Sequence, residues 1–122
     1  MEFTLYDASG RPVAYCDDGR NLYAFNGAPL AYIDGDSVYA FHGEHLAWFE
    51  RGWLRDHEGA CVLFTEGAAP GGPLLPSTHG CPPKGPKLSP RASAYQLPKP
   101  RRPCDAARWS LRSGAQLFPR PR

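Results

Sequence analysis

Glycines recur in the first half of the chain at a nearly constant spacing. Gly10, Gly27, Gly43 and Gly59 are separated by 17, 16 and 16 residues. The sequence around each glycine follows one pattern, with an aliphatic residue three positions later and an aromatic residue five positions later: Val13, Leu30, Leu46 and Val62, then Tyr15, Tyr32, Trp48 and Phe64. A repeat this short is one supersecondary unit, which buries its apolar side chains only by packing against its neighbours.

Each repeat has the sequence of a strand, a tight turn and a second strand. The turns carry a polar residue followed by glycine, as in Asn26-Gly27, and glycine tolerates the positive φ that short hairpin turns require. Further turn residues separate the repeats, for example Asp34-Gly35-Asp36. We therefore predict four hairpins, at about residues 5–16, 22–33, 38–49 and 54–65, with about eight strands in all.

The second strand of each predicted hairpin is apolar on both faces. Side chains alternate along a strand, so Val13 and Tyr15 face one way and Ala14 and Cys16 face the other. A sheet with one face in water carries polar residues on that face, so these strands need cover on both sides. A body of about 65 residues is marginally stable alone. We therefore predict an all-β, symmetric oligomeric assembly, with cover from the C-terminal tail, from further copies of the chain, or from both.

The C-terminal half differs in composition and charge. Only two of the 14 prolines precede residue 68. Residues 1–67 hold 4 bases and 11 acids, a net charge of −7, whereas residues 68–122 hold 10 bases and 1 acid, a net charge of +9. Proline-rich chain favours extended or disordered structure. We therefore divide the chain into a four-hairpin β-repeat domain (1–67), a basic, extended or disordered linker (68–108) and a short anchoring segment (109–118).

The tail has two candidate docking partners. Its charge favours docking onto the acidic, tyrosine-rich hairpin domain, with Trp109, Leu117 and Phe118 as anchors, because large apolar side chains at a chain end need cover. The run from Leu97 to Pro103 also suits the aromatic groove of an SH3-like partner. The sequence leaves both open.

The run from Asn21 to Pro76 resembles the bacterial proteins called 4-fold beta flower proteins. Matches in place include Tyr32-Ile33-Asp34-Gly35-Asp36 and Gly52-Trp53-Leu54-Arg55-Asp56. The resemblance covers roughly residues 3–76, with a further match at 109–110 and 114–118. It implies a four-fold arrangement, as a homotetramer, and it brings no catalytic residues, since the biochemical role of that family is uncharacterised. An array of short hairpins similar to MORN or WG repeats, which are interaction modules, is the alternative.

The aromatic columns of the repeat give the best ligand hypothesis. If symmetry gathers them around an axis, they line an apolar central pocket or the oligomer core, and such a pocket suits a small apolar ligand. Ordinary core packing is the alternative. The candidate residues are Tyr6, Tyr23, Tyr39, Tyr15, Tyr32, Trp48 and Phe64.

No residue set predicts catalysis or a metal centre. His42 and His45 have a spacing that suits metal ligands, but they replace turn-region residues of the other repeats, and a zinc site needs three or four ligands. Asp34 and Asp36 flank Gly35, which is typical of a turn. We therefore expect no enzymatic activity, no cofactor and no metal.

The sequence also predicts a compartment. It contains no apolar run of the ~18 residues that a membrane span needs, and no basic stretch followed by an apolar one that would mark a signal peptide. Its four cysteines form no C-x-x-C pair, which favours free thiols. We therefore expect a cytoplasmic protein without a membrane partner.

These observations favour a non-enzymatic, self-assembling β-repeat protein that serves as a binding or scaffold module. The alternative is a nucleic-acid-associated protein, because the bases of the tail can contact phosphates. However, Tyr95 is the only aromatic residue among the bases from Lys84 to Arg102, and no recognised nucleic-acid module is present. Nucleic acid is therefore the less favoured partner.

Overall fold

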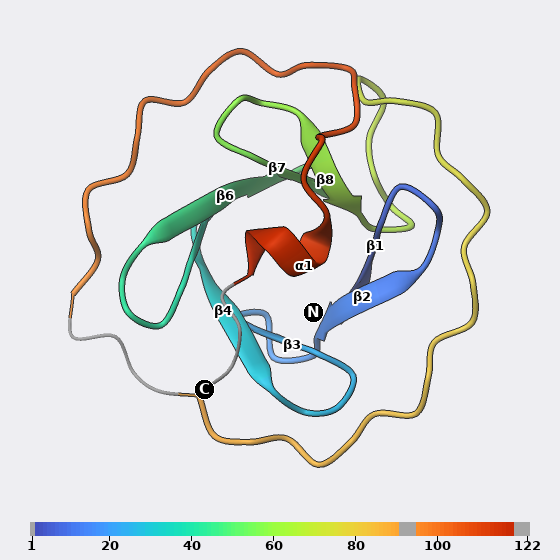
Figure 1. Cartoon of the computed structure of the whole chain (residues 1–122), viewed down its shortest axis with the longest axis vertical. Helices are drawn as coiled ribbons and strands as arrows, with labels where there is room; N and C mark the ends of the chain where they lie inside the picture. Colours follow the sequence, from blue (N-terminus) through green and yellow to red (C-terminus); the bar gives the residue numbers. More distant parts are fainter. Residues whose placement is uncertain (1, 91–94, 119–122) are drawn as a thin grey trace.

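The computed structural model describes residues 2–90 and 95–118. Eight short antiparallel strands follow one another around a closed barrel, and each strand pairs with the strands before and after it in the sequence. Figure 1 shows the hairpins as petals around a common centre. The strands are β1 (Phe3–Tyr6), β2 (Pro12–Cys16), β3 (Asn21–Tyr23), β4 (Pro29–Asp34), β5 (Ser37–Tyr39), β6 (His45–Glu50), β7 (Trp53–Arg55) and β8 (Cys61–Phe64). The predicted all-β fold of four hairpins is confirmed.

Each hairpin closes through the same kind of turn. In the first hairpin the N–H of Asp7 donates to the carbonyl oxygen of Arg11, and the N–H of Gly10 donates to the carbonyl oxygen of Asp7, both at 2.9 Å. Equivalent pairs of hydrogen bonds close the other three hairpins. Gly27 has a φ of 96°, in the left-handed region that glycine adopts without strain. The periodic glycines are therefore turn residues.

A β-bulge recurs at the same position of every hairpin. In the first hairpin Leu5 lies opposite Ala14, whereas Tyr6 lies opposite Pro12, so the register shifts between Leu5 and Tyr6. The other three hairpins shift at the equivalent step. A bulge bends its strand and increases the local twist, which helps short strands close into a barrel.

The barrel interior is filled by aliphatic side chains. Leu5 faces Ala14 across the first hairpin, and a large residue faces an alanine in the next two hairpins as well. The fourth hairpin instead places Leu54 opposite Leu63. All of these side chains are fully buried. Burial of apolar area contributes about 25 cal/mol per Å², so this central cluster is the main stabilising element of the barrel.

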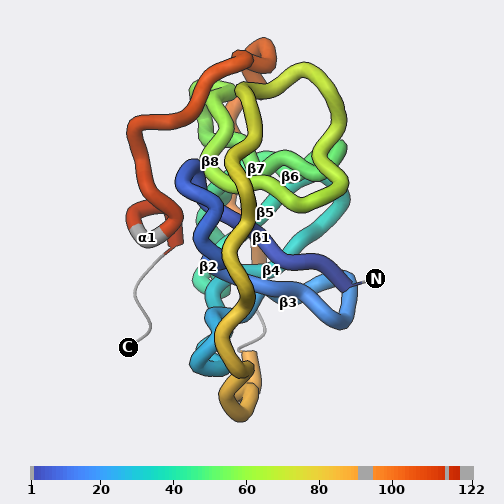
Figure 2. The backbone as a smooth tube through the Cα atoms, turned by 90° about the vertical axis from the view of Figure 1, so that its right-hand side faces the viewer, coloured from blue at the N-terminus to red at the C-terminus, as the bar shows by residue number. Residues whose placement is uncertain are grey.

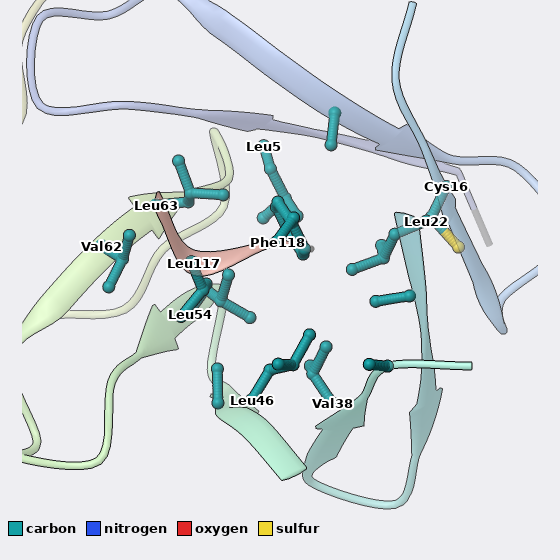
Figure 3. Close-up of a cluster of buried hydrophobic side chains, with 14 residues drawn as sticks. Leu5, Cys16, Leu22, Val38, Leu46, Leu54, Val62, Leu63, Leu117 and Phe118 are labelled. Atoms are coloured by element: carbon teal, nitrogen blue, oxygen red, sulfur yellow. The ribbon is translucent and has the colours of Figure 1, made fainter. Parts of the chain in front are cut away.

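A single helical turn, α1 (Gly114–Leu117), covers one face of the central cluster. Ser113 caps it, because the Ser113 Oγ accepts a hydrogen bond from the N–H of Gln116 while the Gln116 Oε1 accepts one from the N–H of Ser113. Leu117 and Phe118 are buried and belong to the central cluster, and Figure 3 shows them among the aliphatic side chains of the strands. The N-terminus lies on the opposite side of the barrel (Figure 2).

The proline-rich tail runs around the outside of the petals (Figure 1). We call residues 77–90 and 95–106 the strap. Its backbone N–H groups donate to the carbonyl oxygens of the turn glycines, in the pairs His79–Gly10, Leu88–Gly27, Leu97–Gly43 and Ala106–Gly59, at 2.9 to 3.0 Å. The four donors are nine residues apart along the chain. Extended chain of the polyproline II type advances about 3.1 Å per residue, so nine residues span roughly 28 Å, enough to pass from one petal to the next.

Both faces of the strands are therefore covered within one chain. The inner face packs in the central cluster, and the outer face lies under the strap. The four-fold arrangement that the resemblance implied is an arrangement of four hairpins in a single chain. The homotetramer was implied by the resemblance, and self-assembly was inferred from the need to cover both strand faces. One chain covers these faces here, and the homotetramer stays a prediction. Within the described residues, no helix is long and apolar enough to cross a membrane.

Candidate functional site

The seven aromatic residues predicted to line a central pocket lie outside the central cluster. They pair across the junctions between neighbouring hairpins, as Tyr15–Tyr23, Tyr32–Tyr39, Phe64–Tyr6 and Trp48–Arg55. None of them belongs to the central cluster, which is aliphatic apart from Cys16 and Phe118. The expectation of a central pocket lined by these aromatics is therefore corrected, because alternation turns Tyr15 outward where its neighbour Ala14 faces the centre.

Basic residues of the strap lie over these outer aromatics. The Lys84 Nζ is 4.3 Å from the centre of the Tyr15 ring, and the Lys87 Nζ is 5.0 Å from the centre of the Tyr23 ring. A cation over an aromatic face contributes ~0.5–1 kcal/mol at exposed sites. The aromatic columns therefore form the surface on which the strap docks.

The same bases reach acids of the barrel. Lys87 pairs with Asp17, and Arg102 pairs with both Asp36 and Glu50. Each exposed ion pair contributes little alone, but the pairs occur at more than one petal. The opposite charges of the two halves of the chain are thus brought together within one molecule.

The predicted anchors of the last segment lie in two places. Trp109 packs against Trp53 and Phe64, with ring centroids 5.9 Å apart in both cases, and its backbone bridges to Cys61. Leu117, the last residue of α1, and Phe118 lie in the central cluster. Trp109 therefore holds the chain on the outer face just after the strap. Leu117 and Phe118 cover one end of the barrel interior.

The junction between β6 and β7 is polar where the other junctions are aromatic. The His45 Nδ1 lies 2.9 Å from the His57 Nε2, and the His45 ring packs 4.3 Å from the Trp48 ring. Burial of His45, followed by the charges of His57 and Lys99, lowers its pKa to about 4, so the ring is neutral at pH 7. A cavity of about 350 Å³ lies between this pair and α1.

His42, whose spacing from His45 suits metal ligands, lies at the surface. The His42 Nε2 is 3.1 Å from the Glu44 Oε2, and both side chains are largely exposed. Among residues 2–90 and 95–118, no group of three or more histidine, cysteine or acidic side chains is placed to hold a metal ion.

A larger cavity of about 490 Å³ is lined by residues next to the N-terminus. We call this cavity the mouth pocket. The N-terminus lies on the side of the barrel opposite α1 (Figure 2). Phe3 and Phe49 stack beside it, with ring centroids 5.1 Å apart and an interplanar angle of 14°. The residues that line it are Glu2, Phe3, Thr4, Tyr6, Phe49, Gly52, Thr65, Glu66 and Gly67.

The mouth pocket lies where the first and last strands of the barrel meet. β1 and β8 share a single ladder pair, Tyr6 with Phe64. At the other junctions between petals a short turn links one hairpin to the next, whereas here the chain leaves β8 to begin its path to the strap. No connecting turn occupies this junction, and the pocket opens beside it.

Polar groups lie along one edge of the mouth pocket. The Tyr6 hydroxyl donates a hydrogen bond of 3.0 Å to the Glu66 Oε1. Burial, followed by this bond to a carboxylate, raises the pKa of Tyr6, so the phenol stays protonated. The Cys81 thiol of the strap lies 3.9 Å from the Tyr6 hydroxyl and donates to the Thr4 Oγ1 at 3.9 Å. Glu2 and Glu66 are the two charged residues in the lining.

The family model described as 4-fold beta flower protein matches residues 3–118. The chain belongs to the 4-fold beta flower family. The matched range includes the hairpins, the strap and α1. No curated protein and no solved structure matches the chain.

The mouth pocket of this beta flower was not predicted from its sequence. Phe3 lies before the first repeat and Glu66 after the last, so the repeat alignment gave neither of them a column. Tyr6, one of the predicted ligand-pocket residues, does line the mouth pocket. Phe49 carried a second signal, because it puts an aromatic ring in a column that holds Cys16, Ile33 and Thr65 in the other repeats.

Proposed function

We propose that this beta flower is a non-enzymatic binding protein whose barrel presents the mouth pocket to a small, largely apolar ligand. The observation that carries the proposal is the cavity of about 490 Å³ beside the stacked rings of Phe3 and Phe49. Small-molecule sites are commonly concave, predominantly apolar and ~300–1,000 Å³ in volume, with a few polar groups that fix orientation.

The polar chemistry of the pocket suits recognition better than acid–base catalysis. The Tyr6 phenol has a raised pKa and donates a hydrogen bond to the Glu66 carboxylate, so at neutral pH it keeps its proton and holds that carboxylate in place. The hydroxyls of Thr4 and Thr65 add neutral polar groups to the lining. A general base would need a pKa close to the working pH.

The scaffold around the pocket is held from several directions, which supports a preformed site. The barrel is closed by backbone ladders, and the strap is fastened to every petal by a backbone hydrogen bond. A preformed pocket avoids the entropic cost of ordering a loop when ligand binds.

An NMR titration of the full chain with benzyl alcohol tests this proposal. We expect amide shifts to change around Phe3, Phe49 and Glu66, and Phe49→Ala to weaken binding at least about fivefold, through lost apolar contact. Ile33→Ala is the matched control, because Ile33 occupies the same repeat column and does not line the pocket. Circular dichroism checks that both variants fold. Shift changes confined to other parts of the barrel, or equal effects of the two variants, would contradict the proposal.

Assembly into a homotetramer is a second, separable part of the proposal. Leu74 and Leu88 of the C-terminal half are 94% and 62% exposed, and a further copy of the chain would give them cover. Sedimentation equilibrium measures this directly: a tetramer mass supports assembly, and a monomer mass at micromolar concentration leaves the chain as a self-contained binding module.

Nucleic-acid binding through the tail remains the alternative function, with weaker support. Lys87 and Arg102 pair with acids of the barrel, and Lys84 lies over Tyr15, so a nucleic acid would have to compete with these internal contacts. Salt-sensitive binding of DNA or RNA in a gel-shift titration would favour this alternative.

A further inference from the structure

We infer that the ligand class of the mouth pocket is an organic cation: an ammonium group, protonated or quaternary, attached to an apolar body. The inference rests on the proposed binding function and deepens it. Two features carry it, the sign of the charge along the lining and the aromatic surface beside it.

The charged groups in the lining have one sign. Glu2 and Glu66 are acids, and no lysine, arginine or histidine is among the lining residues. Arg51, the base next to Gly52 in the sequence, lies 3.6 Å from the Glu50 carboxylate. An anionic ligand would therefore meet two carboxylates without a balancing base in the lining, whereas a cation would complement them.

The Glu66 carboxylate is oriented by the pocket itself. Its Oε1 accepts the hydrogen bond from the Tyr6 hydroxyl, and Tyr6 is 5% exposed. This bond uses only part of the carboxylate's capacity, since an ionised carboxylate has about four lone-pair sites. The remaining sites are available to an ammonium group.

The aromatic rings of the mouth pocket would contact both the ammonium group and the apolar body of the ligand. Phe3 and Phe49 are partly buried, stack nearly in parallel and line the cavity together with Tyr6. Ring faces attract cations, and aromatic cages with adjacent acids suit quaternary ammonium groups. The same rings receive the apolar body of the ligand.

The strap already shows ammonium groups bound by aromatic rings and a carboxylate of the barrel. Lys84 and Lys87 place ammonium groups over Tyr15 and Tyr23 while Lys87 pairs with Asp17. The β1–β8 junction has aromatic rings and carboxylates too, but there the strap places Cys81 beside Tyr6 in place of a base. The mouth pocket therefore has the groups that receive a cation elsewhere in the molecule, with no basic residue in its lining.

Three probes of similar shape and different charge test the inference on the full chain. They are benzyltrimethylammonium, its neutral carbon isostere neopentylbenzene, and phenylacetate, each titrated by NMR at low salt. We expect the cation to bind roughly 5–30-fold more tightly than the neutral probe, as cation–π and carboxylate contacts together allow, and the anion to bind most weakly. Added salt should narrow the difference.

Glu66→Gln isolates the carboxylate, because the glutamine oxygen can still accept the hydrogen bond from Tyr6. We expect this variant to weaken binding of the cation ~3–10-fold, as for loss of a partly exposed charge contact, and to leave the neutral probe unchanged. Glu44→Gln, on the opposite side of the barrel, is the matched control and should change neither.

The outcomes separate the two proposals. Equal affinities for the cation and its neutral isostere, or a Glu66→Gln variant with unchanged cation binding, would overturn the cation inference while leaving an apolar binding site. Absence of binding by all three probes would overturn the proposed function itself. Shift changes centred on the cavity beside His45 and His57 would also overturn the inference, by placing the site elsewhere.

Discussion

The carbonyl oxygen of Gly10 accepts a hydrogen bond of 2.9 Å from the backbone N–H of His79. A Cβ atom built on Gly10 would collide with the carbonyl oxygen of Ser77, so the strap can approach this closely only because residue 10 has no side chain. The same contact recurs at the other three petals. Each turn glycine therefore has two roles, to adopt a left-handed turn and to leave room for the strap.

Gly27→Ala should destabilise the chain more than Gly35→Ala. Both glycines have positive φ, which costs an L-residue roughly 1–2 kcal/mol. A Cβ at Gly27 would also strike the backbone of Pro86, whereas one at Gly35 meets nothing within 4 Å. We expect Gly27→Ala to lower the free energy of unfolding by about 1–3 kcal/mol more than the control, measured by urea unfolding.

A second readout tests the mechanism of this difference. Displacement of the strap at the second petal should speed tryptic cleavage after Lys84 and Lys87 in Gly27→Ala, and should leave cleavage of Gly35→Ala at the parental rate. Equal stabilities and equal cleavage rates would mean that the glycine contacts do not fasten the strap.

Arg102→Ala should destabilise the chain, and Arg101→Ala should not. The Arg102 guanidinium contacts the Asp36, Glu50 and Asp105 carboxylates and lies 5.5 Å from the centre of the Trp48 ring. Because these groups are partly exposed, we expect a loss of about 0.5–1.5 kcal/mol, which shrinks in high salt. Arg101 is exposed and should change stability by less than about 0.5 kcal/mol. Similar losses from the two variants would contradict this assignment.

The stability of the chain should fall as the pH drops from about 6.5 to about 4. The folded pKa of His45, about 4, lies below the 6.5 of an unperturbed histidine, so the unfolded chain binds this proton first as the pH falls. Linkage then predicts full stability above pH 6.5 and a progressive loss of roughly 1–3 kcal/mol down to pH 4. Urea unfolding at a series of pH values measures it.

His45→Phe is the control for this pH dependence. Phenylalanine keeps a ring between Tyr39 and Trp48 but does not titrate, so the variant should show a flatter profile between pH 6.5 and 4.5. The pKa values of Asp7 and Asp18 are also lowered, by hydrogen bonds. Their protonation changes the stability mainly below pH 4.5, and it should do so equally in both proteins. An unchanged slope in His45→Phe would assign the effect to other groups.

Phe118→Ala should be among the more damaging single changes in the C-terminal segment. Phe118 is 6% exposed and lies in the central cluster, and truncation of a buried phenylalanine costs ~3–5 kcal/mol. Leu111→Ala is the control, because Leu111 is 98% exposed and should change the free energy of unfolding by less than about 0.5 kcal/mol. Differential scanning calorimetry compares the two, and equal melting temperatures would show that α1 does not stabilise the barrel.

Much of the barrel could be predicted from the sequence repeat. The glycine spacing, the aliphatic and aromatic columns that follow each glycine, and the turn residues are local patterns, and each predicted hairpin has its strands within a few residues of the expected bounds. The nine-residue repeat of the strap was not predicted, because the repeated feature is a hydrogen bond from a backbone N–H to the carbonyl oxygen of a turn glycine. Ser77, Pro86, Tyr95 and Cys104 recur at that spacing with no shared side chain.

The candidate site was less predictable than the fold. The residues of the mouth pocket come from β1, β6 and the chain beyond β8, and they meet only once the barrel closes. The aromatic residues were correctly predicted to share one face of their strands. Side-chain alternation alone, however, does not determine which face of a strand points into the barrel. That choice depends on volume, since Leu5 and Ala14 fit the narrow centre of the barrel, whereas the larger Tyr6 and Tyr15 rings have room on its outer side.

By itself the sequence determined the hairpins, their number, their turns and the need to cover both strand faces, because these follow from side-chain alternation and from backbone preferences of neighbouring residues. Only the tertiary structure decided that one chain closes the ring and that its own strap supplies the outer cover. It also decided that the β1–β8 junction opens into a pocket. These outcomes depend on contacts between residues far apart in the chain, such as His79 with Gly10 and Phe3 with Phe49, which local patterns do not encode.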